Sequence, residues 1–194
     1  MNFKLPAFLL SAAALSGCVD IPDFDNAPKI YYNGVSQYTE VDTLNPGTGA
    51  EVIQRREVVV VSVRFEDGDG DLGVDPIDLQ GERGEELRRA YTNVPGWGIP
   101  ANYEVTVLTQ RTDGSWEERV FAEDNANFFP VLKPDGKPGP IKGILDMNID
   151  NNYSNSTVMR KRRYKVRIID RAFNISEQVV IPEGDEVTVP TPRD

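Results

Sequence analysis

The chain has 194 residues, with 21 Lys and Arg against 31 Asp and Glu, one Cys and no His. An acidic surface repels a phosphate backbone, so nucleic acid is not expected as a partner. Without histidine or a second thiol, the chain cannot form a Ser-His-Asp triad, a Cys-His dyad, a histidine-ligated zinc site or an internal disulfide. An enzyme would have to use carboxylates, Lys or Tyr. No two acids stand out as a catalytic pair, so we expect a protein that is not an enzyme.

The first 17 residues have the pattern of an export signal. Lys4 precedes an apolar run from Leu5 to Leu15, which is shorter than the roughly 20 residues of a membrane-spanning helix. The run ends in Leu15-Ser16-Gly17-Cys18, and this ending resembles the lipobox of bacterial lipoproteins. The resemblance implies that residues 1–17 are removed and that Cys18 is lipidated, which tethers the chain to a membrane.

Residues 18–27 are expected to form a flexible acidic tether, because Asp20, Asp23 and Asp25 alternate with apolar and small residues. Acids just after the lipidated cysteine are similar to the export signal of lipoproteins of the Bacteroidota type. That resemblance implies an outer-membrane protein exposed at the cell surface. The alternative is a solvated polar tether that carries no address.

The rest of the chain is rich in short segments of β-branched and aromatic residues separated by Gly, Pro, Asn and Asp. We expect strands at residues 29–32, 57–65, 103–110, 116–122, 143–148, 164–168 and 175–181. Sustained helical periodicity is absent, and only residues 84–91 suggest a short helix. The pattern predicts one all-β domain at residues 28–189, an antiparallel immunoglobulin-like sandwich of about seven strands with long loops, followed by a disordered tail at residues 190–194.

The last expected hairpin resembles the corresponding region of bacterial immunoglobulin-like and fibronectin III-like domains. The shared pattern consists of Tyr164, Val166, Ile168, Asp170, Ala172, Asn174 and Ser176. The resemblance implies the same sandwich fold, although the antibody-type disulfide is impossible with one cysteine.

An acidic loop directly follows the strongest expected strand. Asp67, Asp69 and Asp71 alternate with glycines, which allow several oxygens to converge, and hard oxygen ligands suit Ca²⁺. We expect these three residues to bind Ca²⁺, with Asp75 as a fourth ligand. The loop is not an EF-hand, because Leu72 stands where that loop needs glycine. A solvated turn is the alternative. Asp170 and Asn174 are further candidates at the same end of the sandwich.

Residues 73–100 form a long connection that holds Trp97 among Gly and Pro. Long loops at the end of a sandwich commonly bind partners. Trp97 is therefore a candidate ligand-binding residue, and the equally weighted alternative is a plug that covers the core.

Together these features predict a lipid-anchored binding or structural module of the cell envelope, acting as an accessory subunit of an outer-membrane or surface complex. Its partners are the membrane and an envelope protein or a glycan. The alternative function is a glycan-binding surface lipoprotein of a polysaccharide-uptake system.

Overall fold

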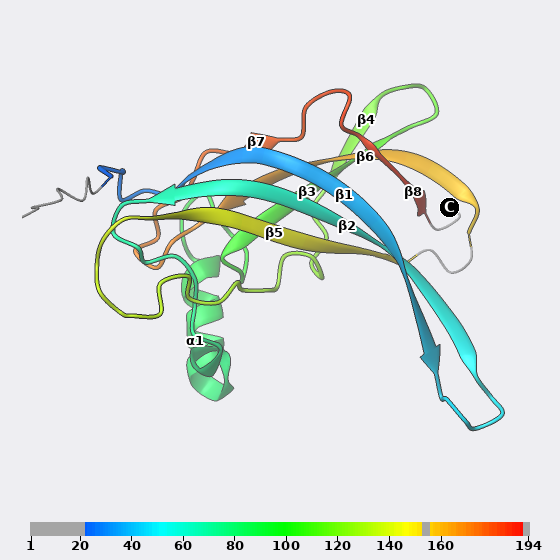
Figure 1. The fold of residues 1–194 in the computed structure, drawn as a ribbon, viewed down its shortest axis with the longest axis horizontal. Helices are drawn as coiled ribbons and strands as arrows, with labels where there is room; N and C mark the ends of the chain where they lie inside the picture. Colours follow the sequence, from blue (N-terminus) through cyan, green and yellow to red (C-terminus); the bar gives the residue numbers. More distant parts are fainter. Residues whose placement is uncertain (1–21, 153–155, 192–194) are drawn as a thin grey trace, which may run out of the picture.

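The computed structural model describes residues 22–152 and 156–191, which form two antiparallel β-sheets packed face to face (Figure 1). The first sheet has the order β1-β2-β5, and its strands are β1 (Lys29–Leu44), β2 (Val52–Asp67) and β5 (Ile141–Asn152). The second sheet has the order β4-β3-β6-β7, and its strands are β3 (Tyr103–Gln110), β4 (Trp116–Arg119), β6 (Val158–Ile168), β7 (Val179–Val180) and β8 (Val187–Thr191), which also pairs with β6. The predicted all-β antiparallel sandwich is confirmed.

The connections give the sandwich an immunoglobulin-like topology. The chain crosses from the first sheet to the second after β2, returns after β4, and crosses again after β5. Each sheet therefore combines a hairpin with strands from a later part of the chain, so that each end of the sandwich has loops from both sheets.

The core between the sheets follows from the two-residue period of the strands. Val59, Val61 and Val63 on β2 face Tyr164 and other apolar residues of β6, and all four are at most 1% exposed. Each such side chain contributes about 1.5–3 kcal/mol relative to an exposed position. This core holds the two sheets against each other.

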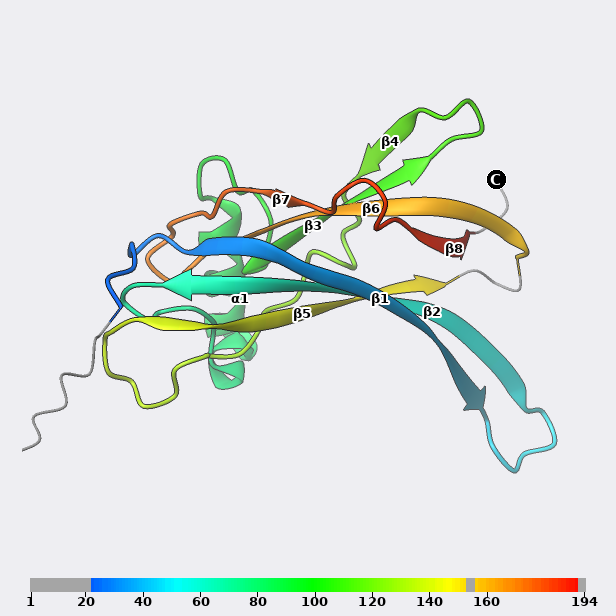
Figure 2. The same ribbon diagram turned by 45° about the horizontal axis from the view of Figure 1, so that its top comes forward.

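β1 and β2 extend past the sandwich as a two-stranded arm (Figures 1 and 2). β5 pairs with β2 only from Arg56 to Asp67, so residues 41–44 and 52–55 pair with each other alone. The expected strands at 29–32 and 57–65 were therefore too short. The arm was missed because both of its faces meet solvent, which removes the apolar alternation that marks a half-buried strand.

One helix, α1 (Gly81–Thr92), follows the 3₁₀ turn η1 (Pro76–Leu79). It contains the expected helix at 84–91 and is longer at both ends. Its Tyr91 packs in a second small core with Val74, Trp97 and Ile169. No helix in the described part of the chain is long and apolar enough to cross a membrane.

Several expected boundaries need correction. The expected strands at 143–148 and 164–168 are longer, at Ile141–Asn152 and Val158–Ile168, the one at 175–181 is reduced to Val179–Val180, and β8 was not expected. β4 ends at Arg119 rather than at residue 122, and β8 runs to Thr191, so residues 190 and 191 belong to the sandwich rather than to a tail. The pairing of β8 with β6, which includes Val158 with Thr191, holds these residues in place.

Candidate metal centre

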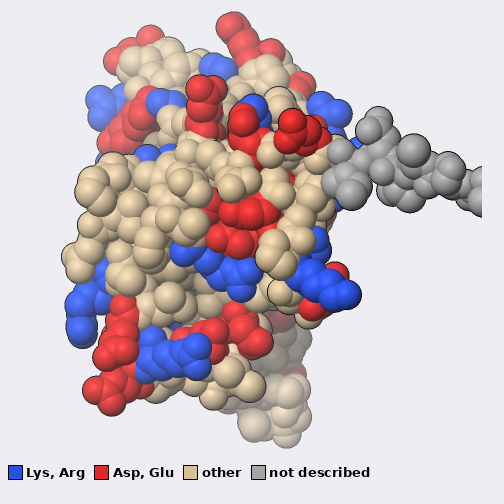
Figure 3. Space-filling model, turned by 90° about the vertical axis from the view of Figure 1, so that its left-hand side faces the viewer, with Lys and Arg blue, Asp and Glu red and all other residues tan. Residues whose placement is uncertain are grey.

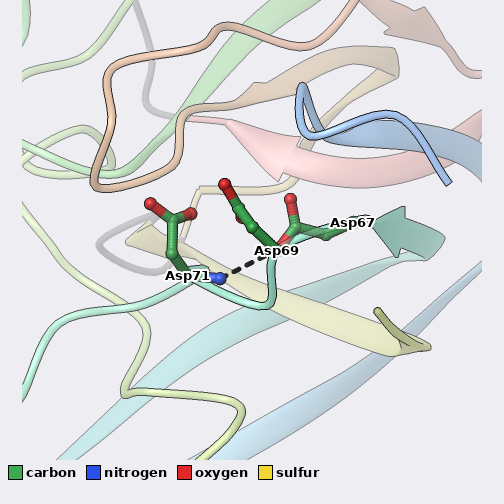
Figure 4. A group of neighbouring side chains, drawn as sticks. All are labelled: Asp67, Asp69 and Asp71. Atoms are coloured by element: carbon green, nitrogen blue, oxygen red, sulfur yellow. Dashed lines mark hydrogen bonds between the residues drawn. The ribbon is translucent and has the colours of Figure 1, made fainter. Parts of the chain in front are cut away.

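The acidic loop begins where β2 ends, at one end of the sandwich. Asp67 is the last residue of β2 and pairs with Ile141 of β5. The side chains of Asp67, Asp69 and Asp71 point to the same side of the loop, and a carboxylate oxygen of each lies within 4.8 Å of the others (Figure 4). The structure thus brings together three of the four predicted ligands.

The carboxylate of Asp67 is completely buried, with 0% of the residue exposed. Its Oδ2 accepts a hydrogen bond from the backbone N–H of Asp71 at 3.1 Å, but its Oδ1 has no hydrogen-bond partner. One buried oxygen each of Asp69 and Asp71 also lacks a partner. Buried polar atoms are rarely left in this state, because each has lost its water without a replacement. Three neighbouring carboxylates, each with an unpartnered buried oxygen, form a group that could hold a metal ion.

A fourth carboxylate approaches from the other sheet. Asp170 follows β6, is 0% exposed, and accepts hydrogen bonds from the backbone N–H of Asn174 at 2.7 Å and from its amide at 2.8 Å. Its negative charge acts on both Asp67 and Asp71. Asp170 and Asn174 thus lie at the predicted end of the sandwich, with Asn174 orienting the carboxylate.

The burial and crowding of these acids oppose their ionisation. Burial, and next the negative charges of Asp69 and Asp71, raise the pKa of Asp67 to about 7. Burial and the charge of Asp170 raise the pKa of Asp71 to about 6. Burial also raises the pKa of Asp170, against the opposing effect of its bonds to Asn174. A bound cation reverses this preference, because it stabilises the ionised carboxylates.

Neighbouring segments hold the loop in its conformation. The carbonyl of Asp69 accepts a hydrogen bond from the N–H of Gly139, and the carbonyl of Leu72 accepts one from Leu132. Gly70 has a φ of 73°, and a Cβ there would lie 2.4 Å from the carbonyl oxygen of Gly139. The glycine is therefore required both by its dihedral angle and by the close approach of the neighbouring loop.

The N-terminal segment packs against the same loop. The N–H of Gly68 donates to the carbonyl of Asp25 at 2.8 Å, and a Cβ on Gly68 would lie 2.3 Å from the carbonyl oxygen of Phe24. The last residues of the expected tether are thus fixed beside the acidic loop. Cys18 itself lies outside the described residues.

Two basic side chains near the acidic loop bind backbone carbonyls there. Arg171 donates from Nε to the backbone carbonyl of Asp71 at 2.8 Å, and its charge lowers the pKa of Asp71. Lys133 directs its amine to the carbonyl of Gly139 at 3.1 Å. Figure 3 shows acidic side chains gathered in the middle of this end of the molecule, with basic ones beside them.

Asp75 does not join the three clustered aspartates. Its Oδ1 accepts a hydrogen bond from the N–H of Ile77 at 2.9 Å, so that it caps η1, and the residue is exposed. The Asx-Pro sequence that places it at a helix start explains this role. The assignment of Asp75 as a ligand is therefore corrected.

Trp97 is a core residue. It is 4% exposed, its indole N–H donates to the carbonyl of Ala101 at 2.9 Å, and the guanidinium of Arg167 lies 5.0 Å from its ring centroid. Of the two alternatives raised by the sequence, the plug is the one that fits this burial. A ring enclosed in this way offers no face for a ligand, so the ligand-binding assignment is corrected.

Comparisons with known protein families, with curated proteins and with solved structures find no match for this chain. The chemistry of the site therefore has to be inferred from its own geometry. Carboxylate oxygens are ligands that hard cations such as Ca²⁺ prefer, and the described residues include neither a histidine nor a thiol.

Proposed function

We propose that this protein is a non-catalytic, lipid-anchored module of the bacterial cell envelope whose sandwich binds Ca²⁺ at Asp67, Asp69, Asp71 and Asp170. It acts as an accessory binding subunit of an outer-membrane or surface complex. The observation that supports the cation site best is the fully buried carboxylate of Asp67. Its Oδ1 has no hydrogen-bond partner, and three other acids lie near it.

Calcium fits this site better than other common metals. Every side-chain donor in it is a carboxylate oxygen, and Ca²⁺ takes six to eight oxygen ligands in flexible geometry, including backbone carbonyls and water. Zinc and copper favour imidazole or thiolate, which the sequence does not supply here. Magnesium demands near-octahedral geometry and gives up its water reluctantly, so its binding is expected to be weaker.

The role of the ion follows from the origin of its ligands. Asp67 ends a strand of the first sheet, whereas Asp170 follows a strand of the second. A cation shared by both carboxylates joins the two sheets at this end of the sandwich. Without it, four mutually repelling carboxylates push the sheet ends apart, so the ion stiffens the domain.

The segment that leads to the proposed anchor joins the sandwich beside the acidic loop. Asp25 is hydrogen-bonded to the acidic loop. Cys18 lies seven positions before Asp25, so the chain between them spans at most about 25 Å when fully extended. If Cys18 carries lipid, the acidic loop faces the membrane and the opposite end of the sandwich faces away. A calcium-stiffened base next to the anchor suits a module that presents its far end to a partner.

Isothermal titration calorimetry tests the cation site. The full chain, purified in detergent and freed of metal with a chelator, is titrated with CaCl₂ at pH 7.5. We expect one site, with a dissociation constant of about 10⁻⁴ to 10⁻³ M or tighter and weaker binding of Mg²⁺. No heat of binding at millimolar Ca²⁺ would contradict the proposal.

Two substitutions of the same type serve as a matched pair. Asp67→Asn removes the charge of the buried ligand and should abolish binding. Asp75→Asn changes an exposed cap outside the cluster and should leave the dissociation constant unchanged. Equal loss in both variants would show that the heat arises from general acidity rather than from this site.

A further inference from the structure

A second site lies at the opposite end of the sandwich, where the two sheets diverge. An open cleft of about 950 Å³ is lined by residues of β3, β4, β5, β6 and β8 and of the segment that follows β4. Its size is within the roughly 300–1,000 Å³ of ligand pockets. The register places it far from the cation site. Asp150 lines the cleft near the C-terminal end of β5. Ile141, which pairs with Asp67, is at the N-terminal end of the same strand. The two are about 30 Å apart along the strand.

The cleft contains a half-buried arginine with an unused donor. Arg162 directs Nη1 to the Oδ1 of the buried Asn151, while its Nε is buried and has no hydrogen-bond partner. Burial lowers the pKa of its guanidinium, and the charge of Asp124 opposes that effect. Nε is closed off from the cleft, but the side chain lines its wall, where a ligand oxygen can accept a hydrogen bond from the rest of the guanidinium.

A half-buried carboxyl faces the same space. Burial, and next the charge of Glu123, raise the pKa of Asp124 to about 6. No ion pair is seen between Asp124 and Arg162 among the described residues, although each acts on the other's charge. The cleft thus offers a strong acceptor and a strong donor that are not satisfied by each other.

The rest of the lining excludes several kinds of ligand. Five carboxylates line the cleft together with four arginines, so neither a polyanion nor a strongly basic peptide is attracted. Most of the other lining side chains are amides and hydroxyls, and only Phe121 and Pro190 are apolar. A lipid or another apolar ligand would lose water-exposed polar surface without compensation.

We infer that this cleft binds a neutral carbohydrate. A sugar hydroxyl both donates and accepts hydrogen bonds, so one ligand can satisfy Asp124 and Arg162 together with the amides around them. Phe121 is the one aromatic residue of the lining, and its partly buried side chain also packs against the core. The inference rests on the proposed function only in taking the protein to be a binding module. It does not depend on the proposed cation, whose site is at the other end of the domain.

The cleft is placed for such a ligand. The segment leading to Cys18 leaves the sandwich beside Asp67, at the end opposite the cleft. The β3–β4 hairpin and the ends of β6 and β8 surround this far end (Figure 2). With the chain anchored as proposed, the opening faces away from the membrane, where a polysaccharide would be met.

The test uses the full chain in a detergent without a sugar head group, at pH 7.5. The probes are neutral hexasaccharides of glucan, xylan, mannan and chitin type, followed by calorimetry and by ligand-observed NMR. We expect at least one probe to bind with a dissociation constant of millimolar or tighter. No binding of any probe at about 10 mM, far above that range, would overturn the inference.

Variants show whether binding occurs in the cleft. Asp124→Asn keeps the side-chain shape, and Arg162→Lys keeps the charge. Each should weaken binding about tenfold or more, the size of a lost charged hydrogen bond. Arg64→Ala, on an exposed position of β2 outside the cleft, is the control and should bind like the unmodified chain. Unchanged affinity in folded Asp124→Asn and Arg162→Lys would contradict the assignment.

Two further outcomes separate this inference from the proposed function. Release of new reducing ends from a probe would support the carbohydrate cleft but contradict a non-catalytic role, with Asp124 and Asp150 as the first acids to examine. Stronger binding of a sulfated than of a neutral hexasaccharide would overturn the inference. Asp67→Asn should leave carbohydrate binding intact, so that loss of the cation site does not affect this test.

Discussion

Asp67 is fully buried, yet with a pKa of about 7 its carboxyl is still partly ionised at neutral pH. The Asp67→Asn variant removes the charge but keeps the shape of the side chain. Without Ca²⁺ we expect it to be more stable than the unmodified chain by about 1–2 kcal/mol, since one member of a repelling cluster is gone. With Ca²⁺ the unmodified chain should gain about 1.4 kcal/mol or more, a stabilisation that the variant should not show. Chemical denaturation in chelator and in 5 to 10 mM CaCl₂, roughly ten times the expected dissociation constant, measures both differences.

The Asp75→Asn variant controls for the general effect of removing a negative charge. It should show no Ca²⁺-dependent difference from the unmodified chain, because Asp75 caps η1 outside the cluster. Destabilisation of Asp67→Asn in chelator would contradict the account of repulsion.

Trp97 is expected to act through packing. Trp97→Ala removes a buried indole, its hydrogen bond to Ala101 and its contact with Arg167, and should cost about 3–5 kcal/mol. Trp116→Ala, at a partly exposed position of β4, should cost roughly 1 kcal/mol or less. Thermal and urea unfolding distinguish the two variants. A loss of similar size in both would show that Trp97 is not a core residue.

At the scale of elements, the arm formed by β1 and β2 stands outside the sandwich. Replacement of residues 43–53 by Asn-Gly joins Asp42 to Gln54, which already pair, through a two-residue turn. The shortened chain should keep one cooperative thermal transition within about 3 °C of the original, because the removed residues contribute no packing to the core. Loss of cooperativity would mean that the arm supports the sandwich.

The sequence predicts the elements best where one side of a strand is buried. Val59 to Phe65 and Tyr164 to Ile168 have the alternation of the core, and the structure places both between the sheets. The arm was missed because a ribbon exposed on both faces has no such alternation. The short β7 and the whole of β8, which was not expected, depend on pairing with β6, a contact between distant segments that no local pattern contains.

The candidate sites show the same difference between what a local pattern predicts and what depends on contacts between distant segments. The spacing of Asp67, Asp69 and Asp71 within one loop was sufficient to predict their convergence. Asp75 belongs to the same stretch, but the proline after it begins η1, so that Asp75 caps this 3₁₀ turn instead of joining the cluster. The cleft at the other end was not foreseen, since Asp124, Arg162 and Asn151 come from three segments that only the folded sandwich brings together.

At the scale of the whole molecule, the buried acids make stability depend on pH. An unfolded aspartate ionises near pH 4, whereas the folded pKa of Asp67 is about 7 and that of Asp71 about 6. Between these values the folded state holds more protons than the unfolded state. In chelator, stability should therefore fall by several kcal/mol as the pH rises from about 4 to about 7, since the two raised pKa values together correspond to roughly 7 kcal/mol.

Calcium should reduce or reverse that fall, because it binds the ionised carboxylates. Asp124 titrates in the same window, but its contribution does not depend on Ca²⁺, so the difference between the two curves isolates the acidic loop. Melting temperatures measured from pH 4.5 to 8, with chelator and with CaCl₂, give both curves. Parallel curves would contradict a cation site at this loop.

The central claim is that the acidic end of the sandwich holds a calcium ion between its sheets. A crystal structure of the protein grown in CaCl₂, with anomalous scattering data, tests this directly. The account predicts one anomalous peak about 2.3–2.6 Å from carboxylate oxygens of Asp67, Asp69 and Asp71, with Asp170 facing it from the other sheet. An ordered acidic loop without a peak at millimolar Ca²⁺ would contradict it.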